Sequence, residues 1–310
     1  MVKFLLNRIS VRGGHDLLRL KLSLIKQLIA IILGLGLFLA LGIFLRDLER
    51  VQKNRWRMAA LAIGLLGITL VLGKAKYGAV NWISVGPFSF QPSEIAKFAV
   101  ILVFARLSRE FGPKAEEFRY GVLGFGAALM GILVPLALEK HLSAILLTGM
   151  VAVVMMFLAG TRMKYLCMGA ALAVVFVGVY ITFMGYAGDR VTAWLDPGSD
   201  PSDTGYQILQ SLYAIGSGGV FGLGFGRSRQ KYLYLPFQYN DYIFAIVCEE
   251  LGLLGAVGIM LLFAALILRG YRIALWARDR FSGMLAAGLT TLLAVQTVLN
   301  LCVVTNLLPS

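Results

Sequence analysis

The sequence predicts an all-α integral membrane protein, a helix bundle with about eight transmembrane helices and one long extracytoplasmic loop. Three observations predict this fold class. Hydrophobic residues make up 59% of the chain and charged residues only 15%, a balance that soluble domains do not show. Apolar runs close to the roughly 20 residues that cross a bilayer recur along the chain. Cations concentrate in alternate loops between these runs, so we expect one multi-pass membrane domain over residues 1–310.

The individual helices are predicted from the length of each apolar run. The long runs are 28–45, 58–73, 121–138, 144–160, 166–185, 242–268 and 284–308. A shorter run at 95–105 contains Lys97 and completes the set. Glycine and alanine recur on these runs, which fits close packing of helices in lipid.

The loop cations orient the bundle. The loops rich in Lys and Arg are 46–57, 106–120, 161–165 and 269–283. Such loops lie on the cytoplasmic side of a membrane. The 74–94 loop and the long loop 186–241 hold fewer cations for their length, and we therefore expect both to face outward.

The basic N-terminal segment, residues 1–26, conflicts with this orientation, because the same topology places its cations outside. It lacks the cleavage site of a signal peptide. Two interpretations remain open. A further helix upstream would resolve the conflict, or the segment lies on the membrane as an amphipathic helix. The apolar side of that helix would be Phe4, Leu5, Leu17, Leu18 and Leu20.

Composition also argues against two other classes of site. The net charge of +13 does not indicate nucleic-acid binding, because basic loops of a membrane protein meet anionic membrane lipid. The three cysteines, Cys167, Cys248 and Cys302, lie far apart in apolar runs. We interpret them as packing residues rather than as a disulfide framework or a zinc site.

Asp241 stands where the long loop re-enters the membrane. One interpretation is a helix N-cap, since Asn240 or Asp241 before Tyr242 would cap a helix well. The other is a general base, because a carboxylate at a water–lipid boundary is desolvated and binds a proton more tightly. The two roles are compatible.

Glu249 and Glu250 follow about two helical turns deeper. Ionisable groups inside a membrane span are expensive and are functional candidates by default. The pair therefore predicts either direct chemistry or a structural role, such as pairing with a cation on a neighbouring helix.

The segment Trp82–Lys97 combines an aromatic residue, a helix start and two opposite charges. Pro92 followed by Ser93 and Glu94 is typical of a first helical turn. Lys97 lies one turn beyond Glu94, so the two predict an i,i+3 ion pair. The alternative is a cation that faces a phosphate in a polar cavity.

The glycine-rich run Gly216–Gly226 matches a nucleotide-binding loop poorly, because no strand is expected before it and no Gly-Lys-Ser/Thr ends it. Its glycines indicate tight turns or close approach of the backbone to a ligand. Cations and tyrosines follow at Arg227, Arg229, Lys231, Tyr232 and Tyr234. This patch suits an anionic, sugar-bearing headgroup or simple anchoring at the lipid interface.

Together these segments resemble the SEDS family (shape, elongation, division and sporulation), the FtsW/RodA/SpoVE-type proteins. The segments occur in family order and span most of the chain. They are Trp82-Ile, Phe90-Gln-Pro-Ser-Glu94 with Lys97, Gly188-Asp-Arg-Val-x-Ala-Trp-Leu-Asp-Pro197, Gly205-Tyr-Gln-x-x-Gln-Ser211, Ala214-Ile-Gly-Ser-Gly-Gly219, Ser228-x-Gln-Lys231, Leu235-Pro236, Asn240-Asp241 and Glu249-Glu-Leu-Gly252.

The resemblance implies a peptidoglycan glycosyltransferase at the outer face of a bacterial cytoplasmic membrane, acting in division, elongation or sporulation. Its substrate would be lipid II, a disaccharide-pentapeptide on a polyprenyl diphosphate. Its partner would be a class B penicillin-binding protein, a transpeptidase. The family's essential acid matches Asp241, which would deprotonate the GlcNAc 4-hydroxyl of the acceptor for an inverting attack on the donor.

Cations must then stabilise the departing diphosphate, and the candidates are Lys97, Arg190 and Lys231. The other substrate-binding candidates at family motif positions are Trp82, Ser93, Glu94, Gln207 and Gln210. The resemblance implies no definite cofactor, although a divalent cation such as Mg²⁺ or Mn²⁺ could assist.

The chain departs from the family pattern in three places. Phe237 follows Leu235-Pro236, where the family usually has an acidic residue. The outward turn Glu139–Ser143 lacks the Pro, Asp and Gly of the usual Glu-Pro-Asp-Leu-Gly. Family members generally have ten helices, and we expect the first and last of them to be missing from the 310 residues.

Two other functions stay open. A transporter of lipid-linked precursors, a flippase, would use Lys97 and Glu249 in an intramembrane cavity. A non-catalytic scaffold, or a truncated fragment, would recruit the transpeptidase and would tolerate the loss of Asp241. The acid at the outer membrane edge favours polymerisation over transport.

Overall fold

The computed structural model describes residues 91–139, 142–183, 194–198, 204–230 and 241–309, with parts of 28–39, 57–69 and 74–90. The chain divides into two compact units, Met1–Asn54 and Arg55–Ser310. In the first unit, the described residues between 28 and 39 are helical and exposed. The site lies in the second unit, to which the following paragraphs refer.

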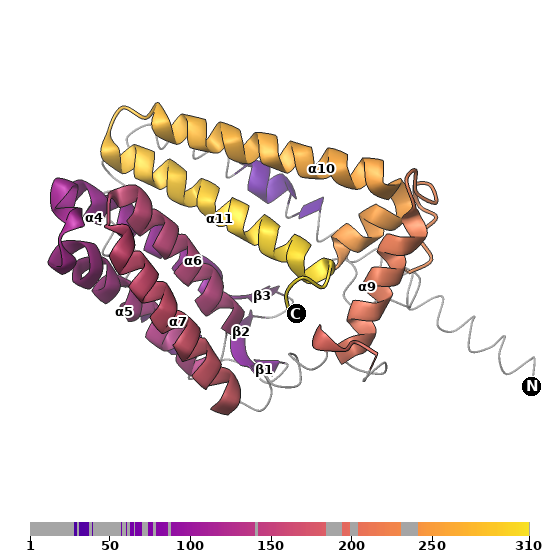
Figure 1. Cartoon of the computed structure of the whole chain (residues 1–310), viewed down its shortest axis with the longest axis horizontal. Coiled ribbons are helices and arrows are strands. Elements are labelled where there is room, and N and C mark those ends of the chain that lie inside the picture. The colour runs from indigo at the N-terminus through magenta and orange to yellow at the C-terminus, as the bar shows by residue number, and fades with distance from the viewer. Residues whose placement is uncertain are drawn as a thin grey trace, which may run out of the picture. The chain divides into compact units, whose positions relative to one another are not determined.

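The second unit is built mainly from helices, as the sequence predicts (Figure 1). The helices are α4 (Pro92–Phe111), α5 (Phe125–Leu138), α6 (Leu142–Ala159), α7 (Met163–Phe183), α9 (Thr204–Gly218), α10 (Ile243–Leu275) and α11 (Arg280–Val304). A 3₁₀ turn (Gly112–Glu116) and a π-helical turn (Arg119–Gly124) connect α4 to α5. Helix α9 lies within the long loop, where the sequence analysis had predicted no helix.

Helix boundaries follow local chemistry. Pro92 occupies the first turn of α4 after Gln91, and Glu94 lies at the positive end of the helix dipole, as expected. Asp279 caps α11, because its carboxylate accepts a hydrogen bond from the Ser282 N–H (3.1 Å). The apolar run predicted at 95–105 is the central part of the longer helix α4.

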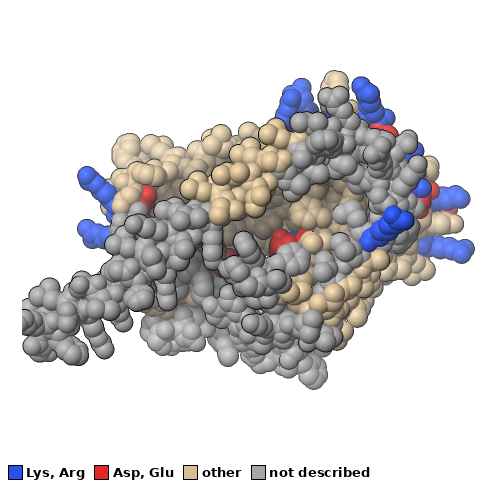
Figure 2. Space-filling model, turned by 180° about the vertical axis from the view of Figure 1, so that it is seen from behind, with Lys and Arg blue, Asp and Glu red and all other residues tan. Residues whose placement is uncertain are grey.

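Four helices in the described part of the chain are long and apolar enough to cross a membrane. They are Arg119–Leu138, Leu142–Ala159, Ile243–Leu275 and Arg280–Val304. Their outward faces carry large exposed apolar side chains, such as Leu261 and Leu262 on α10. On the face drawn in Figure 2, the described Lys and Arg side chains gather toward the two ends. The protein is a multi-pass membrane protein, as predicted.

Helix α10 is not one continuous span, in contrast to the run predicted at 242–268. Gly252 has φ 66° and ψ −166°, which is far from helical geometry. The break separates a short helix, 243–251, from residues 253–275. The latter part extends for about 34 Å at 1.5 Å per residue and can cross the bilayer alone. Figure 1 shows the change of direction in the ribbon.

A small antiparallel sheet precedes α4, where the sequence analysis had predicted only an outward loop. Its strands are β1 (Lys74–Lys76), β2 (Ala79–Val85) and β3 (Phe88–Phe90), in the order β1-β2-β3. Ser84 pairs with Ser89 and Lys74 with Trp82. Strand β2 contacts α4, so the sheet places Trp82 near the start of that helix.

The core of the unit lies where α4, α6 and α11 meet. Ile101 and Phe104 of α4 and Met155 of α6 are fully buried. Gly288 of α11 faces Ile101 and Met155 so closely that a Cβ there would collide with both side chains. Close packing through a small residue is the usual way in which helices associate in lipid.

Candidate functional site

Asp241 directly precedes the short helix 243–251. The cap residue of that helix is Tyr242, which makes no side-chain cap bond. The predicted N-cap role of Asn240 or Asp241 is therefore wrong. Instead, the Asn300 side chain on α11 donates a hydrogen bond to the Asp241 carbonyl (3.0 Å). The Asp241 side chain is exposed, yet desolvation by the surrounding protein raises the pKa of its carboxyl.

The backbone around Asp241 is fixed by an apolar cluster. Tyr242 and Ala245 pack against Ala214 of α9 and Val304 of α11, and all four are at most 2% exposed. The buried Ser211 hydroxyl donates to the Val304 carbonyl (2.8 Å) and ties α9 to the end of α11. Three segments that are distant in sequence therefore position the aspartate.

Two predicted substrate-binding residues lie on α9, which is part of this support. Gln207 and Gln210 are half-buried and three residues apart, so they share one face of the helix. The sequence predicted them from the family motif alone. The structure adds that α9 packs against α10.

The first turns of α4 hold the second group of candidates. Lys97 is 5% exposed and forms an ion pair with the half-exposed Glu94 (2.8 Å), which confirms the predicted i,i+3 pair. Ser93 is 1% exposed, and its hydroxyl has no hydrogen-bond partner among the described residues. A buried cation and an unsatisfied hydroxyl at the end of a helix are suited to an anionic ligand.

Two contacts fix how α4 and α11 lie side by side. Arg280 donates to the Ser108 hydroxyl (3.2 Å), and Gly288 packs against Ile101 further along. The helices are therefore antiparallel, and the start of α4 lies at the same end as Asn300. From this register, Lys97 and Asn300 are about 12 Å apart along the bundle, or roughly two turns. Both groups of candidates thus belong to one end of the bundle.

Other candidates lie outside the described residues. They are Arg190, Lys231 and the side chain of Trp82. Phe237, one of the departures from the family pattern, also lies outside the described residues. One end of the motif that contains Arg190 is nonetheless anchored to the residues that follow α11. The Trp194 ring N–H donates to the Asn306 carbonyl (3.0 Å), and the Asn306 side chain donates to the Trp194 carbonyl (3.3 Å).

Glu139 is a candidate that the sequence analysis treated only as part of a turn. It follows α5 at the outward end and is 1% exposed. Burial raises the pKa of its carboxyl to about 7, and Thr69 has a smaller, lowering effect. Neither carboxylate oxygen meets hydrogen-bond geometry with a described residue. Sequence offered a single signal, an acid at the end of an apolar helix.

Glu249 and Glu250 make structural contacts, which fits the second of the two interpretations. Each is at most 8% exposed, and both side chains accept hydrogen bonds from backbone N–H groups of the loop 226–230. The backbone of the glycine-rich run makes a close approach, as predicted, but it approaches the backbone of α10 and not a ligand.

A divalent cation finds little support in the described part of the chain. No three His, Cys, Asp or Glu side chains converge there in a way that could hold a metal ion. The three cysteines are free; Cys248 is buried as expected of a packing residue, whereas Cys167 is exposed on α7.

Comparison with known proteins gives a consistent result. The family model for cell cycle proteins of the FtsW, RodA and SpoVE type matches residues 10–310. The chain is 39% identical over 269 residues to "Probable peptidoglycan glycosyltransferase FtsW" of Geobacter sulfurreducens, covering 84% of this chain and 72% of that protein. It is 37% identical over 283 residues to "Stage V sporulation protein E" of Bacillus subtilis, covering 88% and 77%.

A solved structure agrees with these relatives. It is described as "Structural coordination of polymerization and crosslinking by a peptidoglycan synthase complex". The alignment has a TM-score of 0.74 and 28% sequence identity, and it covers 91% of this chain and 79% of that one. The helix arrangement described above is therefore shared with a chain of that complex.

Proposed function

Because the chain belongs to the FtsW/RodA/SpoVE family of cell cycle proteins, we propose that it polymerises lipid II into glycan strands at the outer face of the cytoplasmic membrane. Its enzyme class is that of its relatives, peptidoglycan glycosyltransferase. The observation that carries the proposed chemistry is Asp241, an exposed carboxyl with a raised pKa that is held by three helices at the membrane edge.

Asp241 is proposed as the general base. It would accept the proton of the acceptor's GlcNAc 4-hydroxyl, whose oxygen attacks the anomeric carbon of the donor. The new C–O bond forms as the bond to the diphosphate breaks, with inversion, and the polyprenyl diphosphate leaves with the electron pair. Desolvation supports this role, because it brings the proton affinity of a carboxylate closer to that which a base needs near neutral pH.

The cations are proposed to bind the diphosphate. Lys97 has three N–H donors, of which Glu94 occupies part (2.8 Å), so it can also contact a phosphate oxygen. The Ser93 hydroxyl adds a donor in the same turn. Arg190 and Lys231 are proposed for the same task, and Trp82, Gln207 and Gln210 are proposed to line the substrate site.

No step of this mechanism is assigned to a metal ion. A divalent cation that accompanied the diphosphate would take most of its ligands from phosphate oxygens and water, as Mg²⁺ usually does. In the described residues, the nearby acids are too few to hold it alone.

A transpeptidase is the proposed partner. The structurally similar chain belongs to a complex that coordinates polymerization and crosslinking. We propose that this chain pairs in the same way with a class B penicillin-binding protein, which would cross-link the strands that it makes.

The proposed function is tested by polymerisation of purified lipid II by the full chain in detergent or liposomes, with and without a cognate transpeptidase. Asp241→Asn keeps the size of the side chain but removes the base, so we expect a loss of about 10²- to 10⁴-fold. The control is Glu116→Gln, an exposed cytoplasmic-side residue that pairs with Arg162 (3.3 Å). Full activity of Asp241→Asn would exclude a base role for Asp241, whereas no polymer from the wild-type chain would exclude the transferase and leave the scaffold or the flippase.

A further inference from the structure

The break in α10 opens two backbone hydrogen bonds. In an unbroken helix, Leu253 N–H would donate to Glu249 O and Leu254 N–H to Glu250 O. At Gly252 this pattern stops, and unpaired backbone groups are costly in a membrane protein. The loop after α9 supplies all four partners. Leu223 N–H donates to Glu249 O (2.9 Å), Gly224 N–H to Glu250 O (3.0 Å), Leu253 N–H to Gly219 O (2.9 Å) and Leu254 N–H to Val220 O (3.2 Å).

Glycines make this insertion possible. A Cβ at Gly218 would collide with the Cys248 carbonyl, and one at Gly222 would collide with the Glu250 carbonyl. A Cβ at Gly252 would collide with the loop backbone in return. The glycines of the run Gly216–Gly226 therefore allow the backbone of this loop to contact the backbone of α10.

The two glutamate side chains hold the next part of the same loop. Gly226 N–H and Ser228 N–H donate to the two oxygens of Glu250 (3.0 and 3.3 Å). Arg229 N–H donates to Glu249 (2.8 Å), as do the Ser228 hydroxyl and the more distant Gln230 N–H. Hydrogen bonds to a charged acceptor are stronger than neutral ones, so residues 226–230 are tightly held. We call this arrangement the glutamate clamp.

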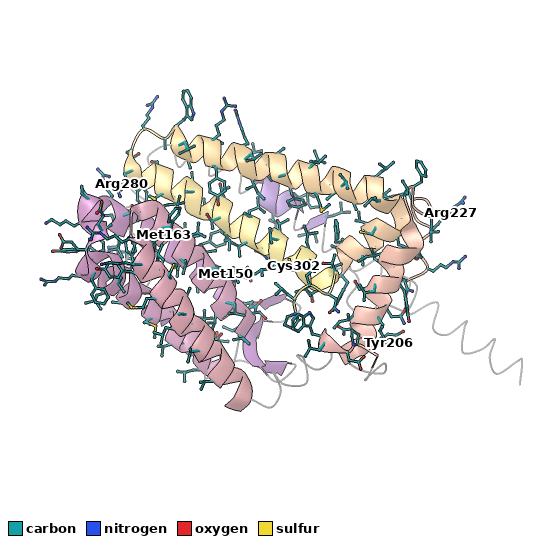
Figure 3. All side chains as sticks on the ribbon, in the orientation of Figure 1. Met150, Met163, Tyr206, Arg227, Arg280 and Cys302 are labelled. Atoms are coloured by element: carbon teal, nitrogen blue, oxygen red, sulfur yellow. The ribbon has the colours of Figure 1, made fainter. Side chains whose placement is uncertain are left out.

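The clamp and Asp241 share one support, the short helix 243–251. Asp241 precedes its first turn, and Glu249 lies at its other end, about 12 Å away along the axis. The clamped loop carries Arg227 and Arg229, both exposed, and Figure 3 shows Arg227 pointing away from the helices. The proposed base and the loop that carries the two arginines therefore lie at opposite ends of the short helix 243–251.

We propose that Glu249 and Glu250 are positioning residues of the transferase. They hold the loop so that Arg227 and Arg229 stay at a fixed distance from Asp241 and meet the diphosphate of the donor lipid as its bond to the sugar breaks. An in-line displacement needs the base and the group that receives the leaving charge to be in place at the same moment. This inference rests on the proposed function and gives the two carboxyl groups a role other than proton transfer.

The two glutamates respond differently to the same substitution. Both oxygens of Glu250 accept backbone N–H groups, so the amide nitrogen of Glu250→Gln must face a donor. Glu249 also accepts from the Ser228 hydroxyl, which can reverse and accept from an amide. Glu249→Gln alone therefore keeps the loop in place. When Glu249→Gln is combined with Ser228→Ala, no hydroxyl is left to accept from the new amide, and the loop should loosen.

Limited proteolysis measures directly how often the loop 226–230 opens. The full chain in detergent micelles is treated with trypsin, and new ends at Arg227 and Arg229 are followed by mass spectrometry. Loss of a hydrogen bond to a charged group shifts an opening equilibrium by roughly 10- to 100-fold. We expect this acceleration for Glu250→Gln and for Glu249→Gln with Ser228→Ala. Glu249→Gln and the control Glu116→Gln should stay close to wild type.

Polymerisation kinetics on the same preparations test the positioning role. We expect Glu250→Gln to lower kcat for lipid II by about tenfold or more, with a smaller change in KM, because the loop acts on the transition state. A double-mutant cycle distinguishes this positioning role from a merely structural one. If the clamp acts through the loop cations, then Glu250→Gln should cost little in an Arg227→Gln, Arg229→Gln background.

Each other outcome overturns the proposal in a recognisable way. Unchanged cleavage at Arg227 and Arg229 in all variants would mean that the glutamates do not hold the loop. Faster cleavage with unchanged kcat, or an undiminished effect in the Arg-free background, would reduce the clamp to a structural contact while the transferase stands. If the wild-type chain makes no polymer, the proposed function itself fails, and the positioning role fails with it.

Discussion

Two carboxyls at the end of the bundle that is predicted to face outward differ in what their environment allows. Burial raises the pKa of both Asp241 and Glu139. Asp241 is exposed and can meet a substrate, whereas Glu139 is 1% exposed and can meet none without movement of the helices. The same physical cause therefore suits the proposed chemistry at Asp241 and affects stability at Glu139.

Glu139 should make the protein less stable as the pH rises. Its carboxyl keeps a proton up to a pH of about 7 in the folded protein, against an ordinary pKa of 4.5. The folded state binds the extra proton between these values, so the free energy of unfolding falls as the pH rises through this window. Glu139→Gln removes this titration. As the pH rises through the window, the free energy of unfolding of the variant should therefore gain about 3 kcal/mol relative to that of the wild type.

The measurement is thermal unfolding in detergent at a series of pH values from 4.5 to 8. The gain of Glu139→Gln over wild type should be small at the acidic end and reach its full size above neutral pH. Glu117→Gln, an exposed residue on the other side of the bundle, is the control. A difference that did not change with pH would contradict the assignment of a buried neutral acid.

At the scale of elements, the broken helix α10 is the most informative feature. The proposed base Asp241 precedes its short part, and its long part is long enough to cross a membrane, so the break separates the proposed chemistry from anchoring. The conformation of Gly252, with φ 66° and ψ −166°, belongs to a region that is essentially restricted to glycine. The break is therefore built into the sequence at one position.

Gly252→Ala should destabilise the protein by about 1–3 kcal/mol from backbone strain alone, with a further cost because its Cβ would meet the loop backbone. Gly258, two turns further along α10, is the matched control, since a Cβ there meets no atom within 4 Å. Gly258→Ala should be neutral or stabilising by up to about 1 kcal/mol. The measurement is again thermal unfolding in detergent, and equal effects of both variants would contradict a special backbone at Gly252.

For the whole molecule, the cation distribution predicts which end faces outward. The turn that contains Lys114 should lie in the cytoplasm, and the clamped loop with Arg227 should lie outside. In a variant without the native cysteines, a cysteine at position 227 should react with an impermeant maleimide in intact cells. A cysteine at position 114 should react only after the membrane is opened. The reverse pattern would invert the topology and remove Asp241 from the outer face.

Part of the candidate site was predictable because its signals are local. Pro92, Ser93 and Glu94 start a helix, as their order predicts, and Lys97 pairs with Glu94, which is one of the two interpretations that their spacing allows. Helices long enough to cross a membrane follow from composition over about 20 residues. The sheet at 74–90 and helix α9 lie in segments that the sequence predicts only as loops, because a polar composition excludes a membrane span without specifying the secondary structure.

The sequence by itself determined the membrane class, the order of the apolar helices and the family, since each rests on patterns within short stretches or on motif order. Only the tertiary structure decided that Tyr242 starts the short helix, that α10 breaks at Gly252 and that Glu249 and Glu250 hold a loop. The break and the glutamate clamp depend on hydrogen bonds between residues about 20–35 positions apart. Such pairings form because a break in a membrane helix must be satisfied by some other backbone, and no local pattern states which one.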